Sequence, residues 1–210
     1  MTRKVTDGPV RNKERTKAKL IDALGSTLKT RGFSGLSVSG VANEAKVDRR
    51  LIYDYFGDLD GLVKEYLNSK DYWKIQPEHV AGIIQMAKED AGKGLAYGVL
   101  EDQFNSLIGN DEMRRIITWG LSDKSPMLKE VDQKREYTGE QILQAVFDPH
   151  FKDGCKNFRA MYALLMGGIY YLTLHAKMQE STFCGIDVQQ PEGQEQIKQA
   201  LKQMIEMMYS

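Results

Sequence analysis

The strongest constraint on the fold is a pair of short helical segments joined by a turn of about three residues. Ser37 is a good N-cap for the first segment, Val38 to about Ala45, because its hydroxyl accepts hydrogen bonds from the free amides of the first turn. Asp48 is placed to cap the second segment. That segment carries Ile52, Tyr53, Tyr55 and Phe56. The sequence therefore predicts a helix-turn-helix motif.

A longer amphipathic helix is predicted in front of this pair, over roughly residues 13–31. Its apolar face is formed by Leu20, Ile21, Leu24 and Leu28. Gly32 follows as a natural left-handed C-cap. Residues 1–12 are polar and basic and predict a flexible arm, which either reaches a DNA backbone or is an untethered tail.

The rest of the chain is also helical in pattern, because no stretch sustains the period-two alternation of a strand. After Gly57 a fourth helix is expected, capped by Asp58 or Asp60 and running towards Trp73. Further helices are predicted near Glu78–Glu89, Gly94–Ile108, Glu112–Leu121, Pro126–Phe147, Lys156–Gln179 and Gly193–Tyr209. The breaks are expected at Gly109-Asn110, Ser125-Pro126, Asp148-Pro149 and Cys184 to Pro191. The prediction is an all-α protein with an N-terminal domain at 1–57 and a larger helical domain at 58–210.

The charge distribution points to a polyanionic partner for the N-terminal domain. The whole chain is formally neutral, but residues 1–56 hold 12 Lys and Arg against 6 Asp and Glu, and the remainder holds the opposite excess. A basic head on an acidic body is typical of nucleic-acid binding.

Two cysteines, Cys155 and Cys184, form neither a CxxC pair nor a disulfide framework, so reduced thiols in a cytoplasmic protein are expected. No apolar h-region follows the N-terminal basic residues, so no signal peptide is predicted. The longest apolar stretch, Ala160–Ala176, falls short of a membrane span and predicts a buried helix. No membrane association is therefore expected.

The sequence gives little support for an enzyme. His79, His150 and His175 are scattered, and none lies at metal-ligand spacing from a carboxylate or cysteine. The chain lacks HExxH, P-loop and GxSxG motifs and has no GxGxxG after a strand. We therefore expect no catalytic residues, metal or cofactor.

Residues 32–62 resemble the TetR family of bacterial regulators. The matching residues are Gly32, Phe33, Leu36, Ser37, Val38, Val41, Ala42, Ala45, Val47, Ile52, Tyr53, Tyr55, Phe56 and Leu62, at the family's spacing and without a gap. Three places depart from the family pattern. Lys46 stands where a turn glycine is common, Asp48-Arg49-Arg50-Leu51 replaces Ser-x-Gly-Thr, and Leu59 replaces a lysine.

The resemblance implies an N-terminal DNA-binding domain whose recognition helix enters the major groove by its N-terminal end. Arg49 and Arg50 are then nearest the bases; either one reads a base while the other holds phosphate, or both hold phosphate. Leu51 either contacts a thymine methyl or is core. The remaining expected contacts, mainly to phosphate, are Ser37, Ser39, Lys46, Tyr53 and Tyr55. The alternative for one of the two tyrosines is a half-buried position.

The resemblance also implies a body that dimerises and binds a small effector. Two helices with apolar stripes form the predicted dimer interface, although a monomer core is the alternative. The interface residues are Leu164, Gly167, Gly168, Leu172, Ile197, Leu201, Met204 and Ile205. Aromatic and methionine side chains form the predicted effector pocket, which competes with a plain helical core. They are Tyr97, Phe104, Trp119, Met127, Tyr137 and Met161.

The function implied is a homodimeric, sequence-specific transcriptional regulator on a palindromic double-stranded DNA operator. The family's usual mode adds repression that a small-molecule effector releases. The alternative is a DNA-associated protein on the same fold without a direct role in transcription, such as a nucleoid or division factor. A helical adaptor that has lost DNA binding is less consistent with Arg49 and Arg50.

Overall fold

The computed structural model describes residues 9–70, 77–122, 126–152, 154 and 156–210. Within these ranges the chain is helical and contains no strand, which confirms the all-α prediction. The chain divides into two compact units, Met1–Tyr72 and Trp73–Ser210. No helix in the described ranges is both long enough and apolar enough to cross a membrane.

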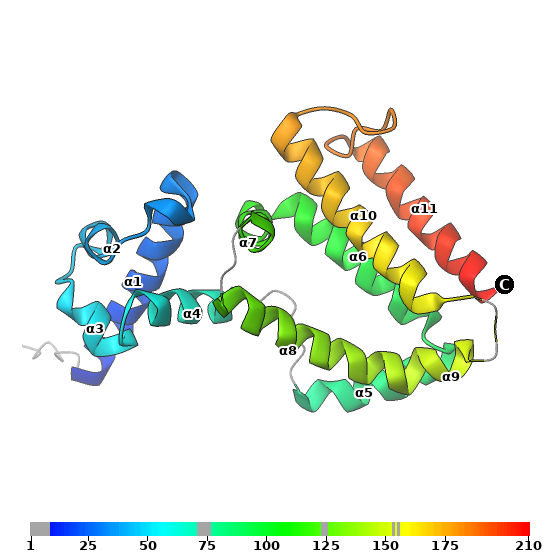
Figure 1. Cartoon of the computed structure of the whole chain (residues 1–210), viewed down its shortest axis with the longest axis horizontal. Helices are drawn as coiled ribbons and strands as arrows, with labels where there is room; N and C mark the ends of the chain where they lie inside the picture. Colours follow the sequence, from blue (N-terminus) through cyan, green and yellow to red (C-terminus); the bar gives the residue numbers. More distant parts are fainter. Residues whose placement is uncertain (1–8, 71–76, 123–125, 153, 155) are drawn as a thin grey trace, which may run out of the picture. The chain divides into compact units, whose positions relative to one another are not determined.

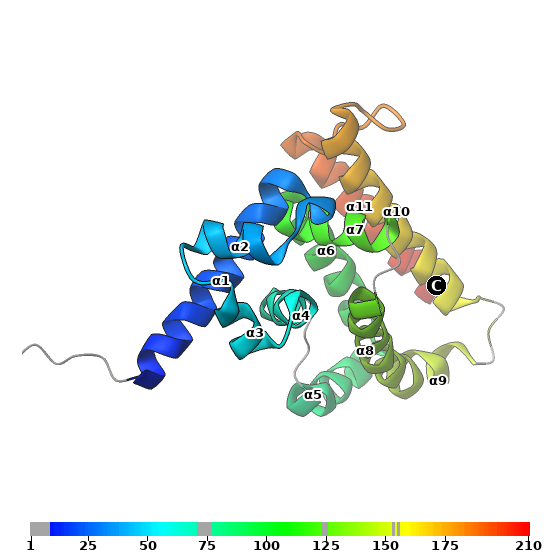
Figure 2. The same ribbon diagram turned by 60° about the vertical axis from the view of Figure 1, so that its left-hand side comes forward.

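The first unit is built around α1 (Pro9–Arg31), which packs on α2 (Val38–Ala45) and α4 (Leu59–Ser69), while α3 (Arg50–Phe56) packs on α4. A single 3-10 turn, η1 (Phe33–Gly35), links α1 to α2. Both views show α2 and α3 joined by a short turn, with α4 following α3 directly (Figure 1 and Figure 2). The core of this unit is formed by Leu20, Leu24, Leu28, Val41, Ile52, Leu62 and Tyr66.

The first helix starts earlier than the sequence indicated. It begins at Pro9, so residues 9–12 are helical and the prediction of a flexible arm is wrong for them. Proline is favourable at the first position of a helix, because its fixed φ suits the helix and its missing N–H would have no partner there. Residues 1–8 of the expected arm lie outside the described residues.

The unit boundary also differs from the one expected after Gly57. The first unit extends to Tyr72, so α4 belongs to it, and the buried residues Leu62 and Tyr66 of α4 are part of its core. A capping signal marks where a helix begins, but not which core receives its apolar face.

The second unit is organised around α6 (Lys93–Gly109), against which α10 (Phe158–Gln179) and α11 (Pro191–Tyr209) both pack (Figure 1). The remaining helices are α5 (Pro77–Ala87), α7 (Asp111–Ser122), α8 (Pro126–Ile142) and α9 (Asp148–Phe151). A 3-10 turn, η2 (Lys88–Asp90), follows α5, and a π-helical segment, η3 (Leu143–Phe147), joins α8 to α9. The core includes Leu100, Phe104, Leu107, Met113, Ile169 and Ile205.

The break predicted at Asp148-Pro149 is wrong, because the helical path continues to Phe151. The wider π-helical turn precedes Pro149, which occupies one of the first positions of α9. Proline is tolerated in a first turn, where its N–H is not needed.

Candidate nucleic-acid interface and apolar cavity

The turn between α2 and α3 holds the two helices in a defined geometry. The Ser37 hydroxyl accepts a hydrogen bond from the Gly40 amide at 3.1 Å and caps α2. Lys46 ends α2 in the left-handed conformation (φ 55°, ψ 47°), and the Val47 amide donates to the Ala42 carbonyl at 3.1 Å. The lysine thus adopts the backbone that glycine takes easily in such turns. The helix-turn-helix is therefore regular, although Lys46 replaces the glycine that is common in the family at this position.

The start of α3 presents two arginines to solvent. Arg49 and Arg50 are both exposed, and the Arg50 amide donates to the Asp48 carboxylate at 2.8 Å. Ile52 is fully buried, so it anchors one face of α3 in the core and leaves the opposite face outward. Asp48 lies one residue before Arg49, which is the N-cap of α3 and makes no side-chain cap hydrogen bond, so Asp48 is not the cap residue that the sequence indicated, although it accepts from the first turn.

The other predicted DNA contacts divide by exposure. Ser37, Ser39, Lys46 and Tyr53 are exposed, whereas Leu51 and Tyr55 are half-buried. Tyr55 is also covered by a cation that sequence reasoning did not identify, because the Lys13 ammonium lies 5.3 Å from its ring centroid. The pairing joins residues far apart in the sequence, and periodicity carries no signal for it.

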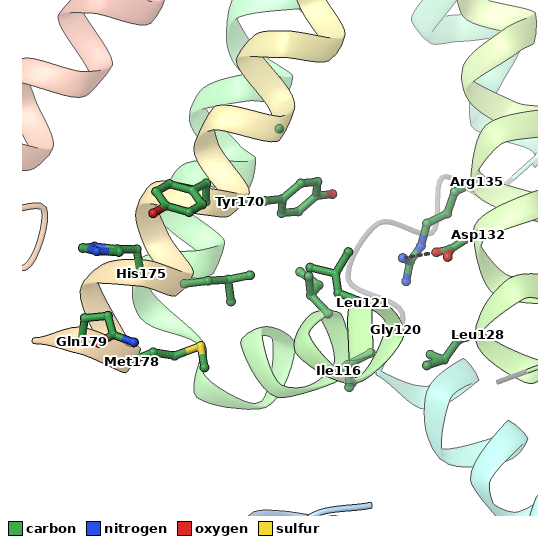
Figure 3. Close-up of a pocket in the computed structure, with 14 residues that line it drawn as sticks. Ile116, Gly120, Leu121, Leu128, Asp132, Arg135, Tyr170, His175, Met178 and Gln179 are labelled. Carbon is green, nitrogen blue, oxygen red and sulfur yellow. Dashed lines mark hydrogen bonds and ion pairs between the residues drawn. The ribbon is translucent and has the colours of Figure 1, made fainter. Parts of the chain in front are cut away.

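The second unit contains a cavity of about 640 Å³ between α7, α8 and α10 (Figure 3). Its apolar lining includes Ile116, Ile117, Leu121, Leu128, Leu174 and Met178. A volume of this size is within the range of small-molecule sites, roughly 300–1,000 Å³.

The cavity is not lined by the six residues that the sequence suggested for a pocket. Phe104 is fully buried in the core, Trp119 is 9% exposed and Tyr137 is 69% exposed. Tyr97 and Met161 pack against the core of the second unit, and Met127 is half-buried on α8.

The Tyr97 hydroxyl donates to Glu101 at 2.9 Å, and burial together with this carboxylate raises the pKa of Tyr97 to about 12.

A few polar side chains enter the cavity from two helices. Arg135 on α8 lies 3.4 Å from the carboxylate of Asp132, and Tyr170 on α10 points across the cavity towards Arg135 (Figure 3). Burial raises the pKa of the Tyr170 hydroxyl, and the Arg135 cation acts in the opposite direction. On the α10 side, the Nδ1 atom of His175 is buried without a hydrogen-bond partner in the described structure. The sequence singled out neither Arg135 nor Tyr170, because each follows an ordinary helical pattern.

The predicted dimer-interface residues fall into two groups. Leu201 and Ile205 are buried in the core of their own unit, whereas Leu164 is 76% and Met204 43% exposed. Gly167 is exposed, and Gly168, Leu172 and Ile197 are half-buried. The exposed members belong to a larger apolar face on α10 and α11, which we call the outer face. It consists of Leu164, Gly167, Tyr171, Met178, Met204 and Met207, of which Gly167, Tyr171 and Met178 also line the cavity.

Metal binding has no visible site in the described ranges, where no group of three or more His, Cys, Asp or Glu side chains is placed to hold an ion. Cys184 is exposed and not in a disulfide, and Cys155 lies outside the described residues.

Comparison with known proteins connects this geometry to one family. Residues 20–66 match the family described as bacterial regulatory proteins, tetR family. The HTH-type transcriptional regulator BetI of Burkholderia thailandensis is 28% identical over 133 residues, which cover 60% of this chain and 66% of that relative, just under two thirds of its length.

Two solved structures share the fold over nearly the whole chain. NalD, the secondary repressor of the MexAB-OprM multidrug efflux pump in Pseudomonas aeruginosa, is 17% identical with a TM-score of 0.61, and the match covers 94% of this chain and 96% of that one. FadR of Bacillus subtilis, in complex with stearoyl-CoA, is 17% identical with a TM-score of 0.57, and the match covers 92% and 97%. These likenesses establish the fold of both units.

Proposed function

Because the chain is a TetR-family transcriptional regulator, we propose that it binds a palindromic DNA operator as a homodimer and represses transcription until a small effector releases it. The observation that carries this proposal is the pair of exposed arginines at the start of α3, on a helix whose other face is anchored by buried Ile52. Such a helix presents its N-terminal residues to base edges in the major groove.

The proposed contacts differ in role. An arginine donates two hydrogen bonds to guanine O6 and N7, and each such pair discriminates against a wrong base by about 1–3 kcal/mol. We assign this role to Arg50 and phosphate binding to Arg49 and Lys46. The Ser37 hydroxyl accepts from Gly40, and its own O–H is able to donate to a phosphate oxygen. Phosphate contacts position the protein without reading sequence.

Two features of the second unit support a dimer and an effector. The outer face on α10 and α11 is apolar and exposed, as expected for a surface that a second copy covers. The cavity between α7, α8 and α10 is large enough for a small molecule. Such a molecule controls DNA binding only if it binds more tightly to one conformation of the dimer than to another.

Selection of binding duplexes from a random library tests the proposal, with affinity then measured against salt concentration. We expect a palindromic sequence to be enriched. We also expect the affinity to fall steeply with salt concentration, because each DNA-binding domain contacts several phosphates and releases their counterions. Salt-dependent binding without an enriched sequence would instead support the alternative of an architectural DNA-associated protein. Loss of all DNA binding in preparations freed of small molecules would contradict both.

A further inference from the structure

The cavity in the second unit is strongly divided between apolar and polar walls. Ile116, Ile117 and Leu121 of α7 and Leu174 of α10 give it apolar walls, while Arg135 of α8 faces Tyr170 of α10 (Figure 3). His175 and Gln179 of α10 also line it. A ligand that fits the apolar walls and the end formed by Arg135 and Tyr170 needs a hydrocarbon body with a polar head at that end. Such amphipathic ligands match cavities in which a few placed polar groups orient an otherwise apolar molecule.

The two facing polar groups are both hydrogen-bond donors. Arginine has five N–H donors and no acceptor, and it is always charged. The Tyr170 hydroxyl makes no hydrogen bond within the described part of the chain, and its burial favours the protonated, donating form. The Tyr170 hydroxyl is also able to accept, but Arg135 can only donate, so a head that contacts Arg135 must accept hydrogen bonds, and a negative charge on it would be matched by the guanidinium.

Asp132 offers the opposite possibility, a cationic head, but its placement is less favourable. Its side chain is 66% exposed, whereas that of Arg135 is only 27% exposed, so the cation is the more buried partner. Their contact of 3.4 Å is long for a charged hydrogen bond and is worth little at a surface. The Nε atom of Arg135 is buried without a hydrogen-bond partner in the described structure, so this N–H is able to donate to an acceptor on a ligand.

We propose that the effector of this protein is an elongated apolar molecule with a carboxylate head, which Arg135 binds and the Tyr170 hydroxyl orients. The inference rests on the proposed function, because it names the chemical class of the molecule that occupies the effector cavity. It is independent of the operator, since ligand binding to the free protein needs no DNA.

Three probes with the same hydrocarbon chain and different heads test the proposal: decanoate, decanol and decylamine. Binding to the full-length protein, freed of co-purified lipids, is measured by titration calorimetry. Decanoate is expected to bind about tenfold or more tightly than decanol, and decylamine more weakly than either, because a charged hydrogen bond adds to the shared burial of the chain.

Variants separate the head group from the cavity as a whole. Arg135→Gln is expected to weaken decanoate about ten- to hundredfold while decanol changes little. Tyr170→Phe should give a smaller loss with the same selectivity. Lys134→Gln is the matched control, because it removes one positive charge from the neighbouring position on α8, outside the cavity lining. Circular dichroism shows whether each variant is folded.

Equal affinities for decanoate and decanol would overturn the proposal, and so would tightest binding of decylamine, which would assign the head to Asp132. Failure of all three probes to bind would overturn it as well. Operator binding of the same preparations, measured separately, shows whether the regulator proposal survives such a result.

Discussion

Under the proposed function, Arg50 is the residue with the clearest consequence for sequence recognition. Its amide is held by Asp48 at 2.8 Å, so the start of α3 is fixed while the side chain extends into solvent. We predict that Arg50→Ala weakens binding to the selected operator by about 1–3 kcal/mol, because a bidentate contact to guanine is lost. Binding to a random duplex should weaken less. Fluorescence anisotropy with the two labelled duplexes at one salt concentration measures both.

Lys46→Ala provides the contrast, because a phosphate contact carries no sequence information. It should weaken both duplexes alike and reduce the salt dependence by about one counterion per head. Equal losses on operator and random DNA for Arg50→Ala would refute the base-reading role and leave both arginines on phosphate.

The role of a single residue was predictable from the sequence where residues a few positions away determine its surroundings. Ser37 caps α2 as the local pattern indicates, Asp48 accepts from the Arg50 amide at the start of α3, and Ile52 is buried where helical spacing places it. The cavity was not predictable in this way. Phe104 and Tyr170 are both aromatic residues of apolar helices, yet one is in the core and the other lines the cavity. The packing of three helices makes that difference.

At the scale of elements, Arg159 links three consecutive helices. From α10 it donates to Asp148 of α9 at 2.6 and 2.9 Å and to Glu140 of α8 at 2.6 and 3.0 Å. These hydrogen bonds hold the pKa of both carboxyls below the usual range. The network spans the π-helical segment η3 and keeps the irregular turn joined to α10.

The depressed carboxyl pKa values predict a pH-dependent effect of Arg159→Gln. A carboxyl with a lowered folded pKa stabilises the protein above its unfolded pKa of about 4, and this stabilisation is lost as the pH falls through the folded value. The variant should therefore lower Tm by a few degrees at neutral pH, and the difference should vanish in strong acid. Thermal melts across pH measure this, with exposed Lys202→Gln as the control. A pH-independent difference would mean that Arg159 acts through packing.

The tight connection between α3 and α4 predicts a second effect on stability. A Cβ added to Gly61 would lie 1.9 Å from the Phe56 carbonyl oxygen, so the backbone must move to accept it. We expect Gly61→Ala to destabilise the first unit by about 1–3 kcal/mol, in the range of other overpacked sites. Urea unfolding followed by circular dichroism measures the loss.

Gly82→Ala is the matched control, since nothing lies within 4 Å of a Cβ at that position in α5. Alanine is the better helix former there and should stabilise the second unit by about 0.5–1 kcal/mol. If the two variants behaved alike, the close approach of α3 and α4 would not be a constraint.

Most helices were predictable because apolar spacing and caps act locally, and the observed limits of α2, Val38–Ala45, coincide with the predicted ones. Pro149 was the exception. Its local signal is a helix break, but the π-helical turn before it leaves proline in a first turn, where it does no harm. Arg159 stabilises that turn from α10, at long range, so a local rule could not anticipate the continuous path.

For the whole molecule, we propose that the outer face is the dimer interface, which would determine whether one or two DNA-binding domains contact the operator. Leu164, Tyr171 and Met178 recur every seventh residue along α10, and Met204 and Met207 are exposed on α11. Leu164 is 76% exposed, and Gly167 beside it has no heavy atom within 4 Å of an added Cβ. A second helix can therefore approach the backbone closely at this point.

We predict that Leu164→Glu converts the protein to a monomer. In a two-fold symmetric dimer each substitution occurs twice in the interface, so two apolar contacts are lost and two carboxylates are brought together. Burying a leucine side chain is worth about 1.5–3 kcal/mol, so the doubled loss, with unpaired charges added, exceeds what most interfaces tolerate. Analytical ultracentrifugation at micromolar concentration measures the mass.

Met86→Glu is the control for Leu164→Glu, because Met86 is equally exposed at 75% but lies on α5, away from the outer face. It should remain a dimer. A monomeric Leu164→Glu variant with intact circular dichroism should bind a single half-site about as well as the parent does. It should lose the additional affinity that the dimer has for the full palindrome over a half-site, because the two DNA-binding domains are no longer linked. A dimeric Leu164→Glu variant would place the interface on another surface, and the separation of the heads would then follow from that surface instead.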